Sequence, residues 1–148
     1  MLISTDPTQE QVAALWQKLN EFNSSKTGPI DYTQLLLESR NSAGVLEGGL
    51  IGNIYDRWLH VHLLWVAEEE RGRGLGSRLL ATAEEQAKAR GCKHSWLDTF
   101  TFQAPDFYAK RGYVAFGVLE DYPQGERHFF LRKAIGRECN SNPGSRPV

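Results

Sequence analysis

The stretch from Trp58 to Ala89 places the strongest constraint on how this chain can fold. It begins with a run of large apolar and aromatic residues, Trp58 to Val66, which predicts a strand. A basic, glycine-rich loop, Arg71 to Gly76, comes next. Apolar residues then recur at every fourth position: Leu75, Leu79, Ala83 and Ala87. This period predicts a helix, and Gly91 stands where a left-handed residue commonly ends one.

A strand, a glycine loop and a helix in this order form a favourable site for an anion. The first backbone N–H groups of a helix have no partner within it and lie at the positive end of its dipole. Glycines let the backbone approach a phosphate closely, and Arg71 and Arg73 add forked donors and positive charge. The loop therefore predicts a phosphate or pyrophosphate ligand without saying which one.

The spacing of the glycines narrows the choice of ligand. The chain contains no Gly-Lys-Ser/Thr, which excludes a P-loop. A dinucleotide loop needs G-x-G-x-x-G, whereas this loop reads G-x-G-x-G and has Ser77 in place of the last glycine. The pattern that fits is R-x-x-G-x-G, preceded by L-x-V and followed by an amphipathic helix. In that setting it resembles the pyrophosphate-binding motif of the GNAT superfamily of acyl-CoA-dependent N-acyltransferases.

The first half of the chain predicts one helix and one hairpin. Apolar residues at helical spacing predict a helix that is capped by Thr5 or Asp6 and ends near Asn23: Val12, Leu15, Trp16, Leu19 and Phe22. A loop, Asn23 to Asp31, follows. Two runs around the turn signal NSAG predict an antiparallel hairpin, Tyr32 to Arg40 with Val45 to Ile54, although a helix over Tyr32 to Ser39 stays open.

The second half predicts a parallel strand, a short helix and a closing hairpin. The run Lys93 to Phe102 predicts a strand parallel to Trp58 to Val66, because the intervening helix makes a βαβ crossover. A short helix over Ala104 to Arg111 is expected to end at Gly112. The turn signal DYPQG joins the last two predicted strands, Tyr113 to Leu119 and Arg127 to Lys133.

The segment QAPDFYAKRGY looks like the second GNAT signature, a helix that bears a tyrosine and ends in Gly-Tyr. The resemblance spans roughly Thr8 to Ala134. It implies an α/β (α+β) fold: a mixed, mostly antiparallel sheet with a central parallel βαβ unit flanked by helices. We expect one GNAT-like domain over residues 1–135 and a disordered tail over 136–148. The chain has a single clear first helix where many relatives have two, so the acceptor side is poorly defined by the resemblance.

Composition excludes several classes of protein. A net charge of −1 argues against a nucleic-acid partner. The two cysteines imply no disulfide framework, and no apolar run approaches the ~20 residues that cross a bilayer. The N-terminus turns polar too early for a signal peptide, so we expect a cytoplasmic protein without a membrane partner. No His/Cys/Asp cluster has metal-ligand spacing, and no metal is predicted.

The GNAT resemblance implies acetyl-CoA (coenzyme A) as the acetyl donor and assigns residues that hold it. Backbone groups of Trp65 and Val66 would contact the thioester and the pantetheine chain. The pyrophosphate would be held by the loop and the first helical turn: Arg71, Gly72, Arg73, Gly74, Leu75, Gly76 and Ser77. The reaction expected is direct attack of a primary amine in a ternary complex, because nothing near Cys92 would lower its pKa for a covalent route.

Three residues are candidates for proton transfer. Tyr108 matches the tyrosine acid of the family and can protonate the leaving thiolate, although a core aromatic is the alternative. His60 and His62 are two residues apart on one strand and so share a face. Their H-x-H before L-x-V resembles the paired histidines of arylalkylamine N-acetyltransferases, which makes His62, and less strongly His60, the candidate base. Structural histidines with ordered water as the base are the alternative.

The acceptor is less well defined by the sequence. Five carboxylates could face a cationic substrate, although each also suits a solvated loop or cap: Glu21, Asp31, Asp56, Asp98 and Asp121. Trp58, Trp96 and Tyr122 could wall a pocket or belong to the core. We expect a small-molecule amine as the acceptor. A protein or peptide amine, a non-catalytic acyl-CoA-binding module and a homodimeric assembly stay open.

Overall fold

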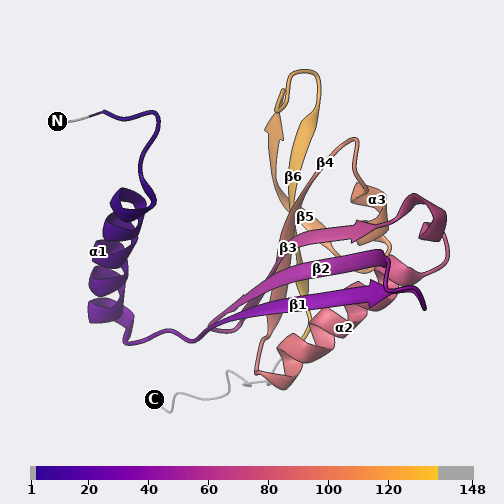
Figure 1. Cartoon of the computed structure of the whole chain (residues 1–148), viewed down its shortest axis with the longest axis horizontal. Coiled ribbons are helices and arrows are strands. Elements are labelled where there is room, and N and C mark those ends of the chain that lie inside the picture. The colour runs from indigo at the N-terminus through magenta and orange to yellow at the C-terminus, as the bar shows by residue number, and fades with distance from the viewer. Residues whose placement is uncertain (1–2, 137–148) are drawn as a thin grey trace, which may run out of the picture. The chain divides into compact units, whose positions relative to one another are not determined.

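A computed structural model describes residues 3–136, which divide into two compact units, one up to Asp31 and one from Tyr32 onward (Figure 1). Each unit is described by itself. The predicted tail over 136–148 lies outside the described residues except for Gly136, whose N–H donates to the Lys93 carbonyl at 3.0 Å. Along the described chain, no helix combines the length and apolar character that crossing a membrane requires.

The N-terminal unit contains one helix, α1 (Gln9–Thr27). The predicted caps, Thr5 and Asp6, are wrong, because Thr8 and Gln11 form a reciprocal capping box. The Thr8 hydroxyl accepts from the Gln11 N–H at 3.2 Å, and the Gln11 side chain accepts from the Thr8 N–H at 2.8 Å. The helix also runs past the predicted end at Asn23. Hydroxyls of Ser25 and Thr27 donate to backbone carbonyls one turn earlier, so these polar residues stay within the helix.

The second unit is built on a six-stranded sheet with the order β1-β2-β3-β4-β6-β5. Its strands are β1 (Tyr32–Arg40), β2 (Leu46–Tyr55), β3 (Trp58–Val66), β4 (His94–Phe100), β5 (Val114–Glu120) and β6 (Arg127–Ala134). Only β3 and β4 pair in parallel, and the other neighbours are antiparallel. The predicted mixed α/β fold with one parallel βαβ unit is therefore confirmed. A helix over Tyr32 to Ser39 is wrong, since that run forms β1.

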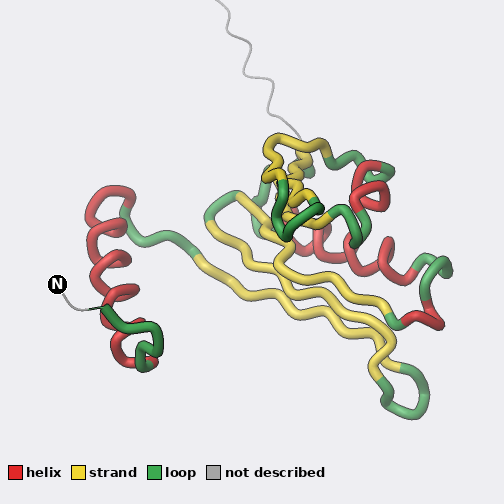
Figure 2. Tube along the Cα trace, turned by 90° about the horizontal axis from the view of Figure 1, so that it is seen from above, coloured by secondary structure: helices red, strands yellow, loops and turns green. Residues whose placement is uncertain are grey.

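Three helical segments accompany the sheet: the 3₁₀ turn η1 (Glu68–Glu70), α2 (Leu75–Ala89) and α3 (Pro105–Ala109). Figures 1 and 2 show α2 running along one face of the sheet. Its apolar side is buried against residues of β2, β3 and β4 that alternate toward it. The central core that results contains Leu50, Ile54, Leu59, Val61, Leu75, Leu79, Leu80, Ala83, Ala87 and Leu97. The apolar residues whose four-residue spacing predicted α2 are therefore the ones that the helix buries.

A polar network lies under the far end of α2. The Glu84 side chain is only 8% exposed and accepts from the Lys133 ammonium at 2.9 and 2.7 Å. The Tyr113 hydroxyl lies 3.0 Å from the same carboxylate and 2.8 Å from the Ser95 hydroxyl. Burial raises the pKa of Tyr113 far above its usual value, so the phenol stays protonated. The network joins α2 to β4, β6 and the residue that precedes β5.

Candidate active site

The central parallel pair separates partway along its length. Cα pairing between β3 and β4 runs from Trp58 opposite His94 to Val61 opposite Leu97 and then stops. Both strands continue, β3 to Val66 and β4 to Phe100. Beyond Val61, therefore, β3 loses its partner on this side, and backbone groups along that edge become available to a ligand.

A bulge lies at the point where the strands separate. On the other side of β3, Ile51 pairs with Leu63 and Gly52 pairs with Val61, which leaves His62 without a partner. An extra residue of this kind bends a strand and re-aims its side chains. The bend explains why the alternation of burial along β3 is interrupted at His62, which is exposed together with Leu63.

A cleft of about 860 Å³ occupies the gap. One wall is β3 from Val61 to Val66, and the opposite wall includes Asp98 and Thr99 of β4 and Tyr108 of α3. The glycine loop and the start of α2 form its end: Arg71, Gly72, Gly74, Leu75, Gly76 and Ser77. Of the predicted cofactor residues, Trp65, Val66 and these six line one cavity. Arg73 does not.

The loop presents unpaired backbone donors to this cleft. Gly74 is the N-cap of α2 and offers no side-chain cap to the first-turn N–H groups. Gly72 and Gly74 have φ angles of 75° and 87°, a left-handed conformation that side chains rarely adopt. A Cβ atom at either position would meet no protein atom within 4 Å. The loop is thus open, and the dipole of α2 and its free amides favour an anion there.

Two arginines bring positive charge into the cleft. Arg71 donates from Nε to the Val66 carbonyl at 3.2 Å. Arg111, which was not predicted, hydrogen-bonds the Ser77 hydroxyl, donates to the Phe107 carbonyl at 2.6 Å and lies 3.6 Å over the Phe107 ring. It therefore ties α3 to the start of α2.

The predicted cofactor residue Arg73 has a different environment. Its guanidinium lies 2.9 Å from the Glu70 carboxylate, which neutralises much of its charge. A role for Arg73 in holding the pyrophosphate stays a prediction.

Gly74→Ala is expected to damage both the fold and the anion site. A left-handed φ costs an alanine about 1–2 kcal/mol, so the free energy of unfolding should fall by that amount. Because the new methyl group points into open space at the cleft, affinity for coenzyme A should also fall, by roughly tenfold. Chemical denaturation and calorimetry measure the two effects. An alanine variant with the stability and affinity of the original chain would contradict this role for Gly74.

Tyr108 lies on the wall of the cleft and is 9% exposed. Its ring meets Phe107 and Tyr113 edge to face, at centroid distances of 5.0 and 5.9 Å. Burial is the largest influence on its pKa, which is raised above 10.0, with Asp98 adding to the rise and Arg111 opposing it. The phenol is thus protonated at neutral pH and can donate a proton.

The two predicted histidines occupy different positions. His62 lines the cleft, whereas His60 does not and stacks flat on Trp96 with a centroid distance of 3.9 Å. Their rings meet edge to face at 5.6 Å, so the two side chains share a side of the sheet. Burial lowers the pKa of His60 below 6.5, opposed by Asp98, and an uncharged imidazole results at pH 7. His62 has the access to the cleft that a base requires.

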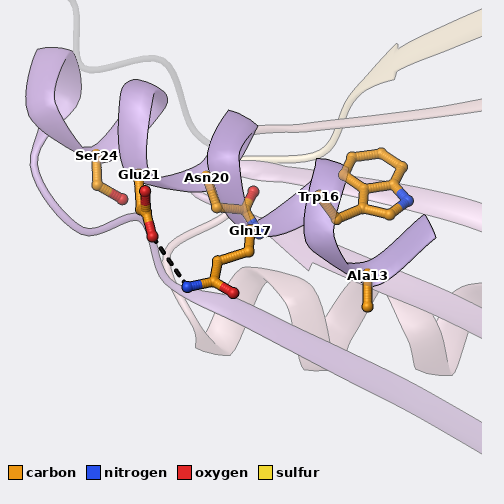
Figure 3. Close-up of a pocket in the computed structure, with 6 residues that line it drawn as sticks. All are labelled: Ala13, Trp16, Gln17, Asn20, Glu21 and Ser24. Atoms are coloured by element: carbon orange, nitrogen blue, oxygen red, sulfur yellow. Dashed lines mark hydrogen bonds between the residues drawn. The ribbon is translucent and has the colours of Figure 1, made fainter. Parts of the chain in front are cut away.

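Of the five carboxylates proposed for the acceptor, only Asp98 lines the cleft. Asp56 and Asp121 are turn residues with φ angles of 53° and 57°. Glu21 belongs to the N-terminal unit, where it accepts from Gln17 at 3.0 Å (Figure 3). It also accepts from Lys18 at 3.0 Å. Figure 3 shows the shallow hollow on α1 that Glu21 lines, and every residue of that hollow comes from α1 itself.

Three side chains of this region were not singled out from the sequence: Arg111, Gln103 and His128. Gln103 lines the cleft, and its carbonyl oxygen lies 3.1 Å from the Thr99 hydroxyl and accepts from the Phe100 N–H at 3.0 Å. His128 on β6 lies 2.7 Å from Asp98 on β4. The contacts of Arg111 and His128 join different elements, and those of Gln103 fix the loop after β4. No residue spacing in the sequence predicts any of these contacts.

Comparisons with known proteins agree with this geometry. Residues 5–113 match the model of the acetyltransferase (GNAT) family. Blasticidin-S acetyltransferase of Streptomyces morookaense is 47% identical over 93 residues, which cover 62% of this chain and 68% of the relative. Acetyltransferase Atu2258 of Agrobacterium fabrum is 35% identical over 124 residues, 84% of this chain and 90% of that protein.

A solved structure extends the match to three dimensions. The crystal structure of an acetyltransferase from Bacillus cereus superposes with a TM-score of 0.81 at 35% identity, covering 90% of this chain and 97% of that one. The sheet, its one parallel pair and the helix behind the glycine loop are therefore features of a shared architecture.

Proposed function

Because the chain belongs to the GNAT family of acetyltransferases, its chemistry is acetyl transfer, and we propose that it moves the acetyl group of acetyl-CoA to a primary amine of a small molecule by direct attack in a ternary complex. One observation carries the proposal. The free edge of β3, the open start of α2 and a buried, protonated tyrosine line the same cleft.

The cleft suits the shape and charge of acetyl-CoA. First-turn amides of α2 and the guanidinium groups of Arg71 and Arg111 favour a pyrophosphate at one end. The unpaired edge of β3 near Trp65 and Val66 offers backbone groups to an amide-containing pantetheine chain. The donor would supply an activated acetyl group as a thioester, and backbone N–H groups on this edge are suited to stabilise a developing oxyanion.

Two proton transfers complete the proposed reaction. An alkyl ammonium has a pKa of ~10, so it must lose a proton before its nitrogen can attack. His62, at the cleft, is the proposed acceptor of that proton. Tyr108 is the proposed donor to the leaving thiolate, which ends as a thiol with a pKa of ~8.5. Burial raises the pKa of Tyr108 and so keeps the phenol protonated until the thiolate forms. The same rise makes the phenol a weaker acid, so the transfer depends on the charge that develops in the cleft during the reaction.

Direct transfer is favoured over an acyl-enzyme because of the position of Cys92. Its thiol is 2% exposed and is not among the residues that line the cleft. Burial is the main cause of its raised pKa, so the reactive thiolate is suppressed.

The proposal of a small-molecule acceptor is supported by the relative named for blasticidin S. A panel of primary amines that includes blasticidin S, polyamines and a lysine peptide, assayed for thiol release, tests it. We expect release with at least one small amine and none with the peptide. Stabilisation by acetyl-CoA without thiol release from any amine would instead identify a non-catalytic binding module.

Replacement of the two histidines should distinguish their roles. His62→Gln is expected to lower kcat about tenfold or more, whereas His60→Gln should lower it by less than about threefold. Steady-state kinetics of the two variants measures both effects. An unchanged kcat in His62→Gln would assign the base to ordered water.

A further inference from the structure

Asp98 presents a negative charge to the cleft. Its side chain is 36% exposed and lines the cavity beside Thr99 and Tyr108. Alternation along β4 directs Leu97 and Thr99 into the core under α2 and Asp98 to the opposite face of the sheet, where His60 and His62 also lie. The carboxylate thus reaches the cleft from the side away from α2.

The groups that contact Asp98 orient its carboxylate, and among the described residues none of them is a lysine or an arginine. His128 Nε2 lies 2.7 Å from Asp98 Oδ2 and donates to it, because an ionised carboxylate can only accept. Nδ1 of His128 is buried and has no hydrogen-bond partner in the described part of the chain. His60 Nε2 is 3.7 Å from Asp98 Oδ1, beyond hydrogen-bond distance, and is held uncharged by burial.

The cationic groups of the cleft lie elsewhere. Arg71 binds the Val66 carbonyl, and Arg111 binds Ser77 at the start of α2 and the Phe107 carbonyl of α3. Within residues 3–136, the ion pairs of Asp98 are with histidines alone. Two carboxylates line the cleft, Glu70 and Asp98, and Glu70 is paired with Arg73. Asp98 is therefore the carboxylate of the cleft that has no arginine or lysine partner among the described residues.

Aromatic rings stand next to this carboxylate. Phe102 is 60% exposed, lines the cleft and stacks on Phe100 at 5.2 Å with an interplanar angle of 6°. Phe100 stacks in turn on His128 at 4.1 Å, and Tyr122 lies 5.6 Å from His128. Phe102 and Asp98 both line the cleft, so an exposed flat ring and a carboxylate face the same space. That combination suits a cation attached to a planar group.

We propose that Asp98, held in place by His128, binds a positively charged group of the acceptor, and that Phe102 packs against a planar part of the same molecule. The acceptor class is then a primary amine that carries a second cationic group on a ring or heterocycle. This inference rests on the proposed function, because it assumes that the cleft between Asp98 and Tyr108 receives the acceptor.

A matched pair of probes tests charge recognition without depending on turnover. 4-(Aminomethyl)benzamidine and 4-(aminomethyl)benzamide have the same shape and the same primary amine, but only the first has a cationic second group. Binding of each is measured by calorimetry with the chain saturated with coenzyme A. A charge-assisted hydrogen bond predicts that the amidine binds about tenfold more tightly than the amide.

Substitutions then assign the preference to Asp98. Asp98→Asn and Asp98→Ser are expected to reduce the preference for the amidine over the amide to within about twofold, since each removes the carboxylate charge. The asparagine oxygen can still accept from His128, and the serine variant covers the case in which asparagine perturbs folding. Phe102→Ala should weaken both probes equally. Asp106→Asn, which removes an exposed carboxylate on α3 that does not line the cleft, should keep the full preference.

The positioning role of His128 has its own readout. His128→Phe keeps a ring against Phe100 but removes the donor to Asp98, so the preference should fall to roughly threefold. A preference that survives in both Asp98 variants, or that is missing from the original chain, would overturn the inference. A preference that depends on Asp98 without release of thiol from any amine would instead contradict the proposed acetyl transfer and leave the cation site standing.

Discussion

Tyr108→Phe is expected to lower kcat about a hundredfold while affinity for acetyl-CoA stays within about twofold of the original. The ring keeps its edge-to-face contacts with Phe107 and Tyr113, so packing of the cleft wall should survive. What is lost is the hydroxyl, a proton donor whose pKa burial raises above 10.0. Steady-state kinetics with the best amine of the panel, together with calorimetry of acetyl-CoA binding, measure the two quantities.

Tyr113→Phe is the matched control for this result. Tyr113 is also a buried tyrosine, but it does not line the cleft, and its hydroxyl bonds Glu84 and Ser95. Loss of this hydroxyl should reduce the free energy of unfolding by roughly 1–3 kcal/mol and leave kcat within about twofold of the original value. A Tyr108→Phe variant that turns over at the original rate would remove Tyr108 from the mechanism and leave protonation of the thiolate to water.

Lys133→Met should lower the free energy of unfolding by about 3 kcal/mol, a large part of the 5–15 kcal/mol typical of a folded domain. The methionine preserves most of the side-chain volume but leaves the Glu84 carboxylate buried without its cationic partner. The Tyr113 hydroxyl is then its only remaining bonded group among the contacts described above. Equilibrium denaturation with urea, monitored by circular dichroism, gives the free energy directly.

Two further variants test whether the loss of stability comes from the burial of the Glu84–Lys133 pair or from the loss of an ion pair as such. Lys88→Met breaks an exposed pair with Glu85, and a surface pair of this kind is worth less than about 1 kcal/mol. The double variant Glu84→Leu with Lys133→Met removes both charges and should recover most of the lost stability, because an apolar pair avoids the cost of desolvation. A Lys133→Met chain within about 0.5 kcal/mol of the original would show that Glu84 reaches water.

The spacing of apolar residues in the sequence predicted the helices and strands whose formation depends on neighbouring residues. The four-residue period of Leu75 to Ala87 follows the buried face of α2, and Trp58 to Val66 coincides with β3. The cap of α1 was misplaced because Thr8 and Gln11 compete with two other plausible caps, and only the reciprocal bonds decide between them. The first helix was also predicted too short, since Ser25 and Thr27 bond backwards within it.

Contacts between distant segments were beyond the reach of those patterns. Asp98 and His128 are 30 residues apart and meet only because β6 lies beside β4, an order that does not follow the sequence. Arg71 and Arg73 look equivalent in the motif, yet only Arg71 lines the cleft, and Arg73 is paired with Glu70. The sequence suggested five carboxylates for the acceptor, and the register of β4 distinguishes one of them.

The early end of pairing between β3 and β4 has a kinetic consequence. Residues from both faces of the sheet line the resulting gap: Leu75 and Gly76 on the side of α2, His62 and Asp98 on the other. We expect the two reactants to approach this gap from opposite faces, so that one can bind whether or not the other is already in place. We expect either substrate to add first, so that product-inhibition patterns fit a random sequential scheme.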